Sequence, residues 1–342
     1  MSHWLASIET NAGGAVSFID ATGLELTRRL NGGNEAKFTL DARDPKVGDL
    51  AIASRAVALY RSGTLRLRGR IWEPLVYRAE SVTVKVCDPW FTLEHRRVRT
   101  TTRYTATDAG TIAWNLINDQ NSLSTTRIRQ GTVTASVSRD RTYERGKQVA
   151  EAIKQLSEVI NGFYFRLDPV DGVAGTHAEL MVMPATASGT TRAGVKFEFG
   201  EETISNIEDY DVSVFLPRNR VTATGAPLEG EGEITAVATN AASITTYDLF
   251  DEEASFATVE TTGTLQEHAD EEVRANPIKT YSLSLGPDAP MLWDNFDVGD
   301  IISFYIENGE LTETGTARVV EATVEVTGED SERLKNLVIQ AV

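Results

Sequence analysis

The C-terminal segment Asp294–Gln340 carries the pattern that most limits what this chain can fold into. An apolar run, Ile301–Ile306, leads into Asn308-Gly309, and both of these residues accept the positive φ angles of a type I′ hairpin turn. Between Ala317 and Val326 apolar and polar side chains then alternate, which is the period of a strand with one buried face. The segment therefore predicts a meander of three or four antiparallel strands, half of a small barrel or sandwich.

The chain is too long for one such unit. At 342 residues it exceeds what one hydrophobic core usually organises, so we expect two or three domains. No apolar run approaches the roughly 20 residues that span a bilayer, and the N-terminus shows no secretory signal. The single cysteine, Cys87, excludes an intramolecular disulfide framework and a cysteine-based zinc site, and we expect it to be a small buried hydrophobe.

Charge is distributed unevenly along the chain. The net charge is −17, yet residues 1–170 hold 24 basic and 18 acidic side chains, whereas residues 171–342 hold 9 basic and 32 acidic ones. Tight binding of nucleic acid needs clustered Lys and Arg, so we do not expect it from a chain this acidic. An acidic surface would keep a passing duplex from sticking, although from charge alone simple solubility is the favoured explanation.

Residues 4–90 are expected to form mostly strands. Leu65 and Leu67 share one face of a strand, and the arginine row, Arg66, Arg68 and Arg70, shares the other. Because no aromatic residues interleave with the arginine row to stack on bases, we expect the solvated side of a strand rather than a polyanion-binding stripe. A second strand alternates in the same way, with Val82, Val84 and Val86 facing inward.

A mixed α/β segment follows at residues 99–196. Thr107 or Asp108 can cap a helix that runs to about Asn118. A second helix, ended by Asn161-Gly162, is predicted by a single apolar stripe that consists of Val149, Ile153, Leu156 and Ile160. Two strands, Phe163–Phe165 and Glu179–Met183, complete the segment.

Strands resume after residue 196. Gly225-Ala226-Pro227 and the Glu-Gly run that follows it indicate an exposed boundary between domains. Thr264, with Glu267 three residues later, fits a capping box that opens a short helix ending near Ala275.

The sequence shows no catalytic, cofactor-binding or metal-binding motif. Four histidines without paired-ligand spacing are expected at the surface: His3, His95, His177 and His268. Adjacent acidic pairs such as Glu201-Glu202 are expected by chance among 50 acidic residues, so they do not identify a glycosidase. Most of the five tryptophans are expected in the core rather than on a sugar-binding platform: Trp4, Trp72, Trp90, Trp114 and Trp293.

Four short segments resemble the tail-tip hub, or baseplate hub, proteins of long-tailed bacteriophages, which are minor tail proteins. Gly63–Ile71 and Val82–Arg96 look like the first barrel of these hubs, and the Phe296–Asp300 turn with the strand Arg318–Val320 is similar to their final barrel. The order of the parts resembles the hub along most of the chain. No functional residue of that family can be carried over.

The resemblance implies a mainly β (α+β) protein with two tail-tube-like antiparallel β-barrel domains and an α/β insertion. The expected boundaries are 1–98 plus 197–226 for the first barrel, 99–196 for the insertion and 227–342 for the second barrel. It also implies a homotrimeric ring, without enzymatic activity or cofactor, that joins a sixfold tail tube to a threefold tip. The resemblance further implies that the protein is made in the host cytoplasm and resides in the virion. There it would contact the tube, distal tail and tip proteins, and DNA would pass through the lumen of the ring without binding specifically.

Other classes of protein remain open. A distal tail protein of the same particle would share a tube-like barrel but would form a hexamer. A glycan-binding or receptor-binding tail protein would present exposed aromatic side chains, and a cell-wall hydrolase would need a catalytic constellation that the sequence does not show.

Overall fold

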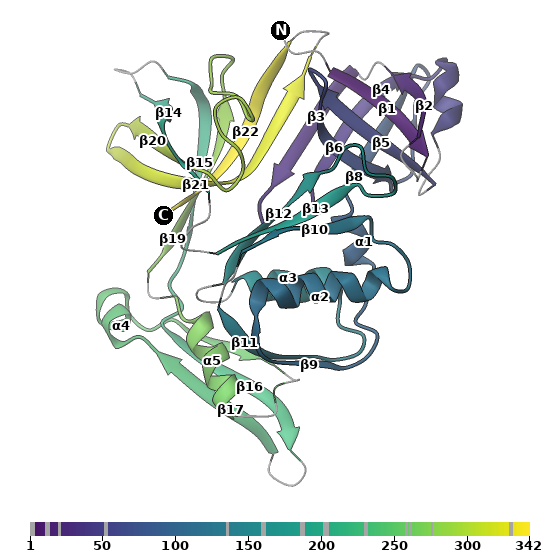
Figure 1. The fold of residues 1–342 in the computed structure, drawn as a ribbon. Coiled ribbons are helices and arrows are strands. Elements are labelled where there is room, and N and C mark those ends of the chain that lie inside the picture. Colours follow the sequence, from purple (N-terminus) through teal and green to yellow (C-terminus); the bar gives the residue numbers. More distant parts are fainter. Residues whose placement is uncertain are drawn as a thin grey trace.

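The computed structural model describes residues 4–10, 14–19, 22–50, 54–134, 137–158, 162–184, 189–200, 205–228, 232–256, 259, 262–274, 276–327 and 331–342. Its fold is mainly β, as predicted, and it has four parts (Figure 1). The N-terminal sheet and the C-terminal sheet lie at the top of the view. The insertion lies below them, and a small β–α unit, hereafter the small unit, lies at the bottom.

The N-terminal sheet is an antiparallel array in the order β3-β4-β8-β6-β5-β1-β2, with the short β7 on β8. Its elements are β1 (Trp4–Thr10), β2 (Ala15–Ile19), β3 (Thr22–Arg29), β4 (Glu35–Asp41), the 3-10 helix η1 (Pro45–Asp49), β5 (Arg55–Arg61), β6 (Thr64–Ile71), β7 (Val76–Tyr77) and β8 (Ser81–Cys87). The predicted inward face of β8 is confirmed, since Val82, Val84 and Val86 are fully buried. Cys87 is buried at the end of that strand, and burial raises the pKa of its thiol to about 12.

The insertion builds its own hydrophobic core. Its elements are α1 (Trp90–Glu94), β9 (Thr102–Asp108), α2 (Ala109–Asn121), β10 (Ile128–Val133), β11 (Ser138–Tyr143), α3 (Val149–Glu158), β12 (Phe163–Pro169) and β13 (Ala178–Pro184). Helices α2 and α3 lie between the three-stranded β10-β13-β12 sheet and the two-stranded β11-β9 sheet (Figure 1). The unit begins before the expected residue 99, because Trp90 and Leu93 of α1 belong to the same core.

Both predicted helices of the insertion are confirmed. The Asp108 carboxylate caps α2 by accepting from the backbone N–H of Thr111 at 2.9 Å. The stripe of α3 is buried at Val149, Ile153 and Leu156, whereas the predicted stripe residue Ile160 and the predicted terminator Asn161 lie outside the described residues.

The C-terminal sheet contains the predicted meander. Its strands are β14 (Thr191–Phe199), β15 (Ile207–Phe215), β19 (Ile278–Leu285), β20 (Ile301–Asn308), β21 (Leu311–Val326) and β22 (Glu332–Ala341). The pairs β20–β21, β21–β22, β22–β19 and β19–β15 are antiparallel, and the β14–β20 pair is parallel. Within the segment for which the meander was predicted, the pairs β20–β21 and β21–β22 are antiparallel as expected, and the parallel partner β14 comes from outside it.

The β20–β21 hairpin forms, but its turn is shifted by one residue from the prediction. Asn308 pairs with Leu311, so the two loop residues are Gly309 and Glu310. Among the described residues of this turn only Gly309 has a positive φ, 60°. One positive φ at the first loop position fits a type II′ turn, which requires glycine there, rather than type I′.

The segment 197–226 does not join the N-terminal sheet as expected. Its strand β15 pairs with β19, and β16 pairs with β17 and β18 in the small unit. The small unit consists of β16 (Arg220–Leu228), β17 (Gly232–Thr239), α4 (Ala241–Tyr247), β18 (Asp251–Ser255) and α5 (Thr262–Glu272). The boundary expected at Gly225–Pro227 therefore falls within β16, and the predicted helix begins two residues before its expected cap, Thr264.

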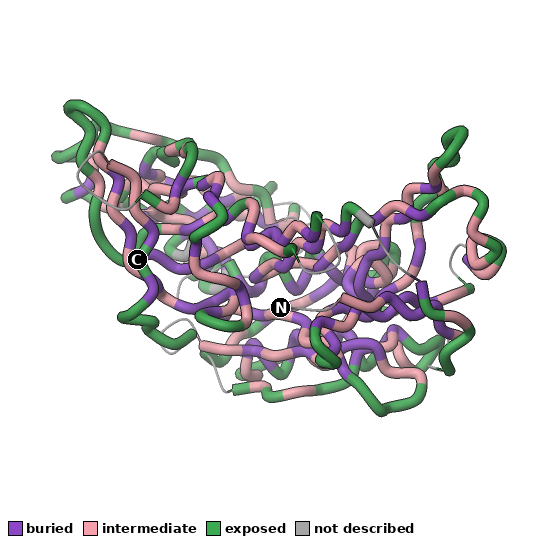
Figure 2. Tube along the Cα trace, turned by 90° about the horizontal axis from the view of Figure 1, so that it is seen from above, coloured by how far each residue is buried: buried purple, intermediate pink, exposed green. Residues whose placement is uncertain are grey.

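One strand pair makes the two large sheets continuous. β3 pairs antiparallel with β21, with Leu26 opposite Val324 and Thr27 opposite Thr323, whose hydroxyls are 3.0 Å apart. The result is a single 14-stranded sheet. Seen from above, buried residues form the inner runs of the two sheets and exposed residues gather in the outer loops (Figure 2).

Candidate functional site

The described part of the chain contains neither a metal-binding cluster nor a helix that could cross a membrane. No cluster of three or more His, Cys, Asp or Glu side chains within the described ranges could hold a metal ion. No helix in the described part of the chain is long and apolar enough to cross a bilayer.

Two of the four histidines are buried, which contradicts the prediction of surface positions. His177 is buried between Arg127 and Val170, to whose backbone its own N–H and C=O are hydrogen bonded. Burial, together with nearby Arg127, lowers the pKa of His177 to about 3. His268 on α5 is also buried and stacks on Phe256 with ring centroids 4.3 Å apart; burial lowers its pKa to about 3 as well. His95 is exposed as predicted, and His3 lies outside the described residues.

Four of the five tryptophans, all except Trp72, lie in the hydrophobic cores or pack against them. Trp90 is buried and stacks on Phe165 with ring centroids 4.8 Å apart, which links α1 to β12. The other four tryptophans are half-buried. Trp4 and Trp293 lie with ring centroids 6.0 Å apart and pack on the cores of both large sheets.

The arginine row is an internal surface, not the solvated face that the sequence predicts. Arg68 is buried, donates to the carbonyl of Val170 at 2.6 Å and pairs with Glu9 at 3.0 Å. The guanidinium of Arg66 stacks on Trp293, and that of Arg70 stacks on Trp72. The row faces the insertion and the C-terminal sheet, because these parts cover the outer side of β6.

Three parts of the molecule meet at a set of mostly buried arginine–carboxylate contacts, hereafter the joint. The joint consists of Arg28, Arg61, Asp168, Asp294, Asp297 and Glu332. Arg28 on β3 donates from Nε to Asp297 at 2.6 Å and from Nη2 to Asp168 at 2.6 Å. Asp168 belongs to the insertion and Asp297 to the C-terminal sheet, so one guanidinium connects all three large parts.

Electrostatics keep this part of the joint charged. Burial opposes the charge on Arg28, but Asp297 and Asp168 outweigh it and raise the pKa of Arg28 above its usual range. Burial likewise disfavours ionised Asp297, and Arg28 outweighs it and lowers the pKa of that carboxyl. Bidentate arginine pairs of this kind fix orientation as well as distance, so the contact sets the angle between the parts.

A second contact of the joint connects the two large sheets alone. Arg61 at the end of β5 pairs with Asp294 at 2.5 Å and with Glu332, while the indole N–H of Trp4 donates to Glu332 at 2.6 Å. The side chains of Arg61 and Glu332 are 10% and 8% exposed, so water competes little for this pair.

Hydrogen bonds of Asn34 and Asp88 also connect the N-terminal sheet to the insertion. The Asp88 carboxylate accepts from the backbone N–H of Asn34 at 2.8 Å and from the backbone N–H of Trp90 at 2.9 Å. The side-chain amide of Asn34 donates onward to the carbonyl of Leu167 at 3.1 Å. Burial raises the pKa of Asp88 to about 7, although these hydrogen bonds favour its ionised form.

The small unit carries a concentrated negative charge. Residues 220–274 hold 12 acidic and 2 basic side chains. The acidic run Asp251-Glu252-Glu253 lies exposed on β18, where Arg220 pairs with Asp251 and Arg218 with Glu252. The predicted pair Glu201-Glu202 lies outside the described residues.

The sequence did not reveal the joint. Residues of the joint that contact one another are separated by up to 271 positions, as Arg61 and Glu332 are. The only local signals were the Arg28-Arg29 pair between leucines and the Asp297-Val298-Gly299-Asp300 turn. Neither signal identifies a partner.

Comparison with known proteins supports a fold assignment. No family model matches the sequence, and no curated protein matches it. Among solved structures, a tail protein from Neisseria meningitidis MC58 is 11% identical, with a TM-score of 0.62 over 99% of this chain and 96% of that chain. A prophage tail protein from Listeria monocytogenes EGD-e is 11% identical, with a TM-score of 0.60 over 99% of this chain and 94% of that chain.

A third solved structure has a similar fold over the whole chain. The 43 kDa tail protein of prophage MuSo2 from Shewanella oneidensis is 13% identical, with a TM-score of 0.60 over 100% of this chain and 98% of that chain. Identities this low carry information about the fold only. The resemblance found in the sequence is confirmed at that level: the chain has the fold of these phage and prophage tail proteins.

Proposed function

We propose that this protein is a structural component of a phage tail and acts as the hub of the tail tip. The observation that carries the proposal is the match, along nearly the whole length of both chains, to three tail proteins. The joint fits a geometric role, because it connects three parts through buried, directional contacts. The protein would reside in the virion at the tail tip, after synthesis in the host cytoplasm, and would contact tube, distal tail and other tip proteins.

In this role three chains would form a ring, each contributing two tube-like β units. The continuous sheet supports the idea, because β3 and β21 hold the N-terminal and C-terminal sheets of one chain in a fixed relation. We propose the N-terminal sheet and the C-terminal sheet as these two units, with the insertion and the small unit as appendages. Six units in a threefold assembly would match the sixfold symmetry of a tube.

Counting subunits tests the ring. We expect images of purified tails, or of the assembled protein, to show three copies around the axis. Six copies would favour the alternative of a distal tail protein and would contradict the hub.

We also propose that the acidic second half lines much of the channel, so that DNA passes without adhering. The support is the excess of 32 acidic over 9 basic side chains in residues 171–342, together with the exposed carboxylates of the small unit. A threefold reconstruction should show a negatively charged channel wall. A neutral or basic wall would refute this part of the proposal alone.

The remaining alternatives predict activities that can be assayed. A wall hydrolase would clear peptidoglycan in a gel, and a glycan-binding protein would be retained on cell-wall material. We expect neither result, since the described residues contain no cluster of side chains that could hold a metal ion and their tryptophans are at least half-buried.

A further inference from the structure

A pocket of about 730 Å³ opens on the outer face of the N-terminal sheet. It lies between the strands β1 and β2 and the loop that follows β12 in the insertion, residues 171–174. Volumes of several hundred Å³ are typical of sites that hold a ligand or a buried side-chain group. The pocket is separate from the joint and contains none of its six residues.

The floor of the pocket has one positive and two negative groups. Arg68 Nε lies 3.0 Å from Glu9 Oε2, and Arg68 Nη2 lies 3.2 Å from Asp171 Oδ1. The Arg68 and Glu9 side chains are only 5% and 4% exposed, whereas Asp171 is 56% exposed at the mouth. Two carboxylates thus share one guanidinium, which leaves a net negative charge that a cation entering the mouth would neutralise.

Two further polar groups surround this floor. The Tyr60 hydroxyl lies 3.3 Å from Arg68 Nη2. The Ser7 hydroxyl is buried and has no hydrogen-bond partner. A buried hydroxyl without a partner costs stability, so a donor or acceptor arriving from a ligand would be favoured there.

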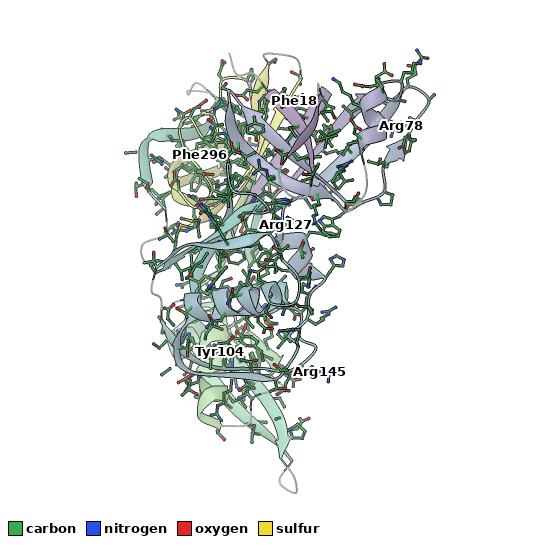
Figure 3. The ribbon with its side chains drawn as sticks, turned by 45° about the vertical axis from the view of Figure 1, so that its right-hand side comes forward. Phe18, Arg78, Tyr104, Arg127, Arg145 and Phe296 are labelled. Atoms are coloured by element: carbon green, nitrogen blue, oxygen red, sulfur yellow. The ribbon has the colours of Figure 1, made fainter. Side chains whose placement is uncertain are left out.

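The walls of the pocket are apolar. Leu5, Phe18, Val173 and Ala174 line it, and Phe18 is 52% exposed at the edge of the sheet. Figure 3 shows Phe18 near the top of the N-terminal sheet. An apolar wall above a negative floor matches a side chain with an aliphatic stem and a cationic head, which is the chemistry of arginine and lysine.

The strand beside the pocket is an open edge. Among the described strands, β2 pairs only with β1 and ends the strand order of the sheet. Its N–H and C=O groups on the side away from β1 pair with no described strand, so they can accept another extended segment, whose alternate side chains would face the pocket. The carboxylates of Glu9 and Asp171 favour a basic side chain as the occupant.

We propose that this pocket is a docking site for an extended segment of a partner protein, which pairs with β2 and inserts one arginine or lysine side chain toward Glu9 and Asp171. The site does not depend on the assembly proposed above, because a monomer already contains every residue that forms it.

The test uses two capped peptides of the form Thr-Val-X-Val-Thr, with X as arginine or glutamine. Binding to the full chain is followed by NMR or calorimetric titration. We expect the arginine peptide to bind about tenfold more tightly than the glutamine peptide, and this preference to weaken as salt is raised. Equal affinity of the two peptides would overturn the proposal.

Variants locate the site. Asp171→Asn keeps an exposed loop residue of equal size and should reduce the preference for arginine several-fold, whereas Glu9→Gln should abolish it. Because Glu9 is buried, far-UV circular dichroism must show that Glu9→Gln is folded. If Glu9→Gln does not fold, the result for Asp171→Asn alone tests the site. The matched control is Asp119→Asn, an exposed carboxylate paired with Arg99 far from the pocket, which should leave the preference intact. If Asp171→Asn still prefers the arginine peptide as strongly as the wild type does, the proposed site is wrong. If instead the wild type self-associates and Asp171→Asn does not, the occupant is a second copy of this chain.

Discussion

Arg28 shows how one residue can determine the relation between parts of a protein. Its side chain is 5% exposed, while Asp168 and Asp297 are 21% and 23% exposed. Burying these charges costs free energy, which is recovered only because the guanidinium geometry satisfies both carboxylates. The contact is therefore better understood as a device that specifies orientation than as a large source of stability.

Removing the Arg28 side chain should be costly because Asp168 and Asp297 lose the buried guanidinium that they share and keep only the more exposed Arg166 as a counter-charge. We expect Arg28→Ala to lower the free energy of unfolding by about 3 kcal/mol, measured by urea denaturation. The control is Arg99→Ala, whose exposed pair with Asp119 should contribute less than about 1 kcal/mol. Equal effects of the two substitutions would show that the joint is not energetically distinct from the surface.

His177 should make stability depend on pH. Its pKa is about 3 when folded and close to 6.5 when unfolded, so below pH 6.5 only the unfolded chain binds the proton. Its contribution is complete above pH 6.5 and is lost as the pH falls toward 3, by about 1.4 kcal/mol per pH unit. Between pH 7 and pH 5 the wild type should therefore lose more stability than His177→Gln does, by about 2 kcal/mol in urea unfolding.

Two other groups with shifted pKa values make the comparison with the variant necessary. His268 acts in the same direction as His177, while Asp88, whose pKa rises to about 7, favours the folded state at lower pH. Both contribute equally to wild type and His177→Gln and cancel in the difference. Parallel pH profiles of the two proteins would contradict the role given to His177.

At the scale of elements, close backbone contacts decide which strands can be neighbours. β6 and β8 meet at Arg70–Cys87 and Ile71–Val86, beside Gly69. A Cβ atom on Gly69 would lie 2.2 Å from the carbonyl oxygen of Cys87, a distance that backbone atoms cannot accommodate without shifting. Glycine at this position therefore allows the two strands to meet.

Gly69→Ala should destabilise the N-terminal sheet by about 1–3 kcal/mol, as overpacking typically does. The measurement is urea unfolding followed by circular dichroism. Gly48→Ala, where a new Cβ would meet no atom within 4 Å, is the matched control and should change stability little. A neutral Gly69→Ala would mean that the strands separate without cost.

Local patterns predicted some elements and missed others. Helices α2 and α3 were predictable because a cap or an apolar stripe lies within a few residues of each helix. The small unit was missed because its described buried core is dominated by small residues: Ala223, Ala236, Ala238, Leu265 and Ala269. Alanine contributes little to an apolar pattern, so β16 and β17 looked like a boundary between domains, although the capping box predicted the helix at α5.

At the scale of the whole molecule, the cores differ greatly in size. Each large sheet and the insertion bury a cluster rich in Leu, Ile, Val and Phe, while the small unit buries the alanine-rich cluster. Figure 1 shows the small unit at one end of the molecule, away from the sheets that β3 and β21 join. Apolar burial is the main source of stability, so the small unit has the least to hold it folded.

Hydrogen exchange should reveal this difference. We expect amides of β16, β17 and α5 to exchange fastest by local opening, and amides of β3, β21 and β22 to be the most protected, near the limit of global unfolding. Mass spectrometry of peptic fragments provides the measurement. Protection in the small unit equal to that in β21 would show that the whole chain opens as one cooperative unit.

The sequence by itself determined the mainly β class, the C-terminal hairpin and the two helices of the insertion, because each rests on residues that are close along the chain. It also determined which strand faces avoid water, as Val82, Val84 and Val86 show. Only the tertiary structure decided what covers the other faces. The arginine row alternates as a solvated face would, yet the insertion and Trp293 cover it, since periodicity records polarity and not the part of the chain that arrives from far away. The joint, the parallel β14–β20 pair and the β3–β21 pair likewise depend on contacts between residues distant in sequence, which no local pattern encodes.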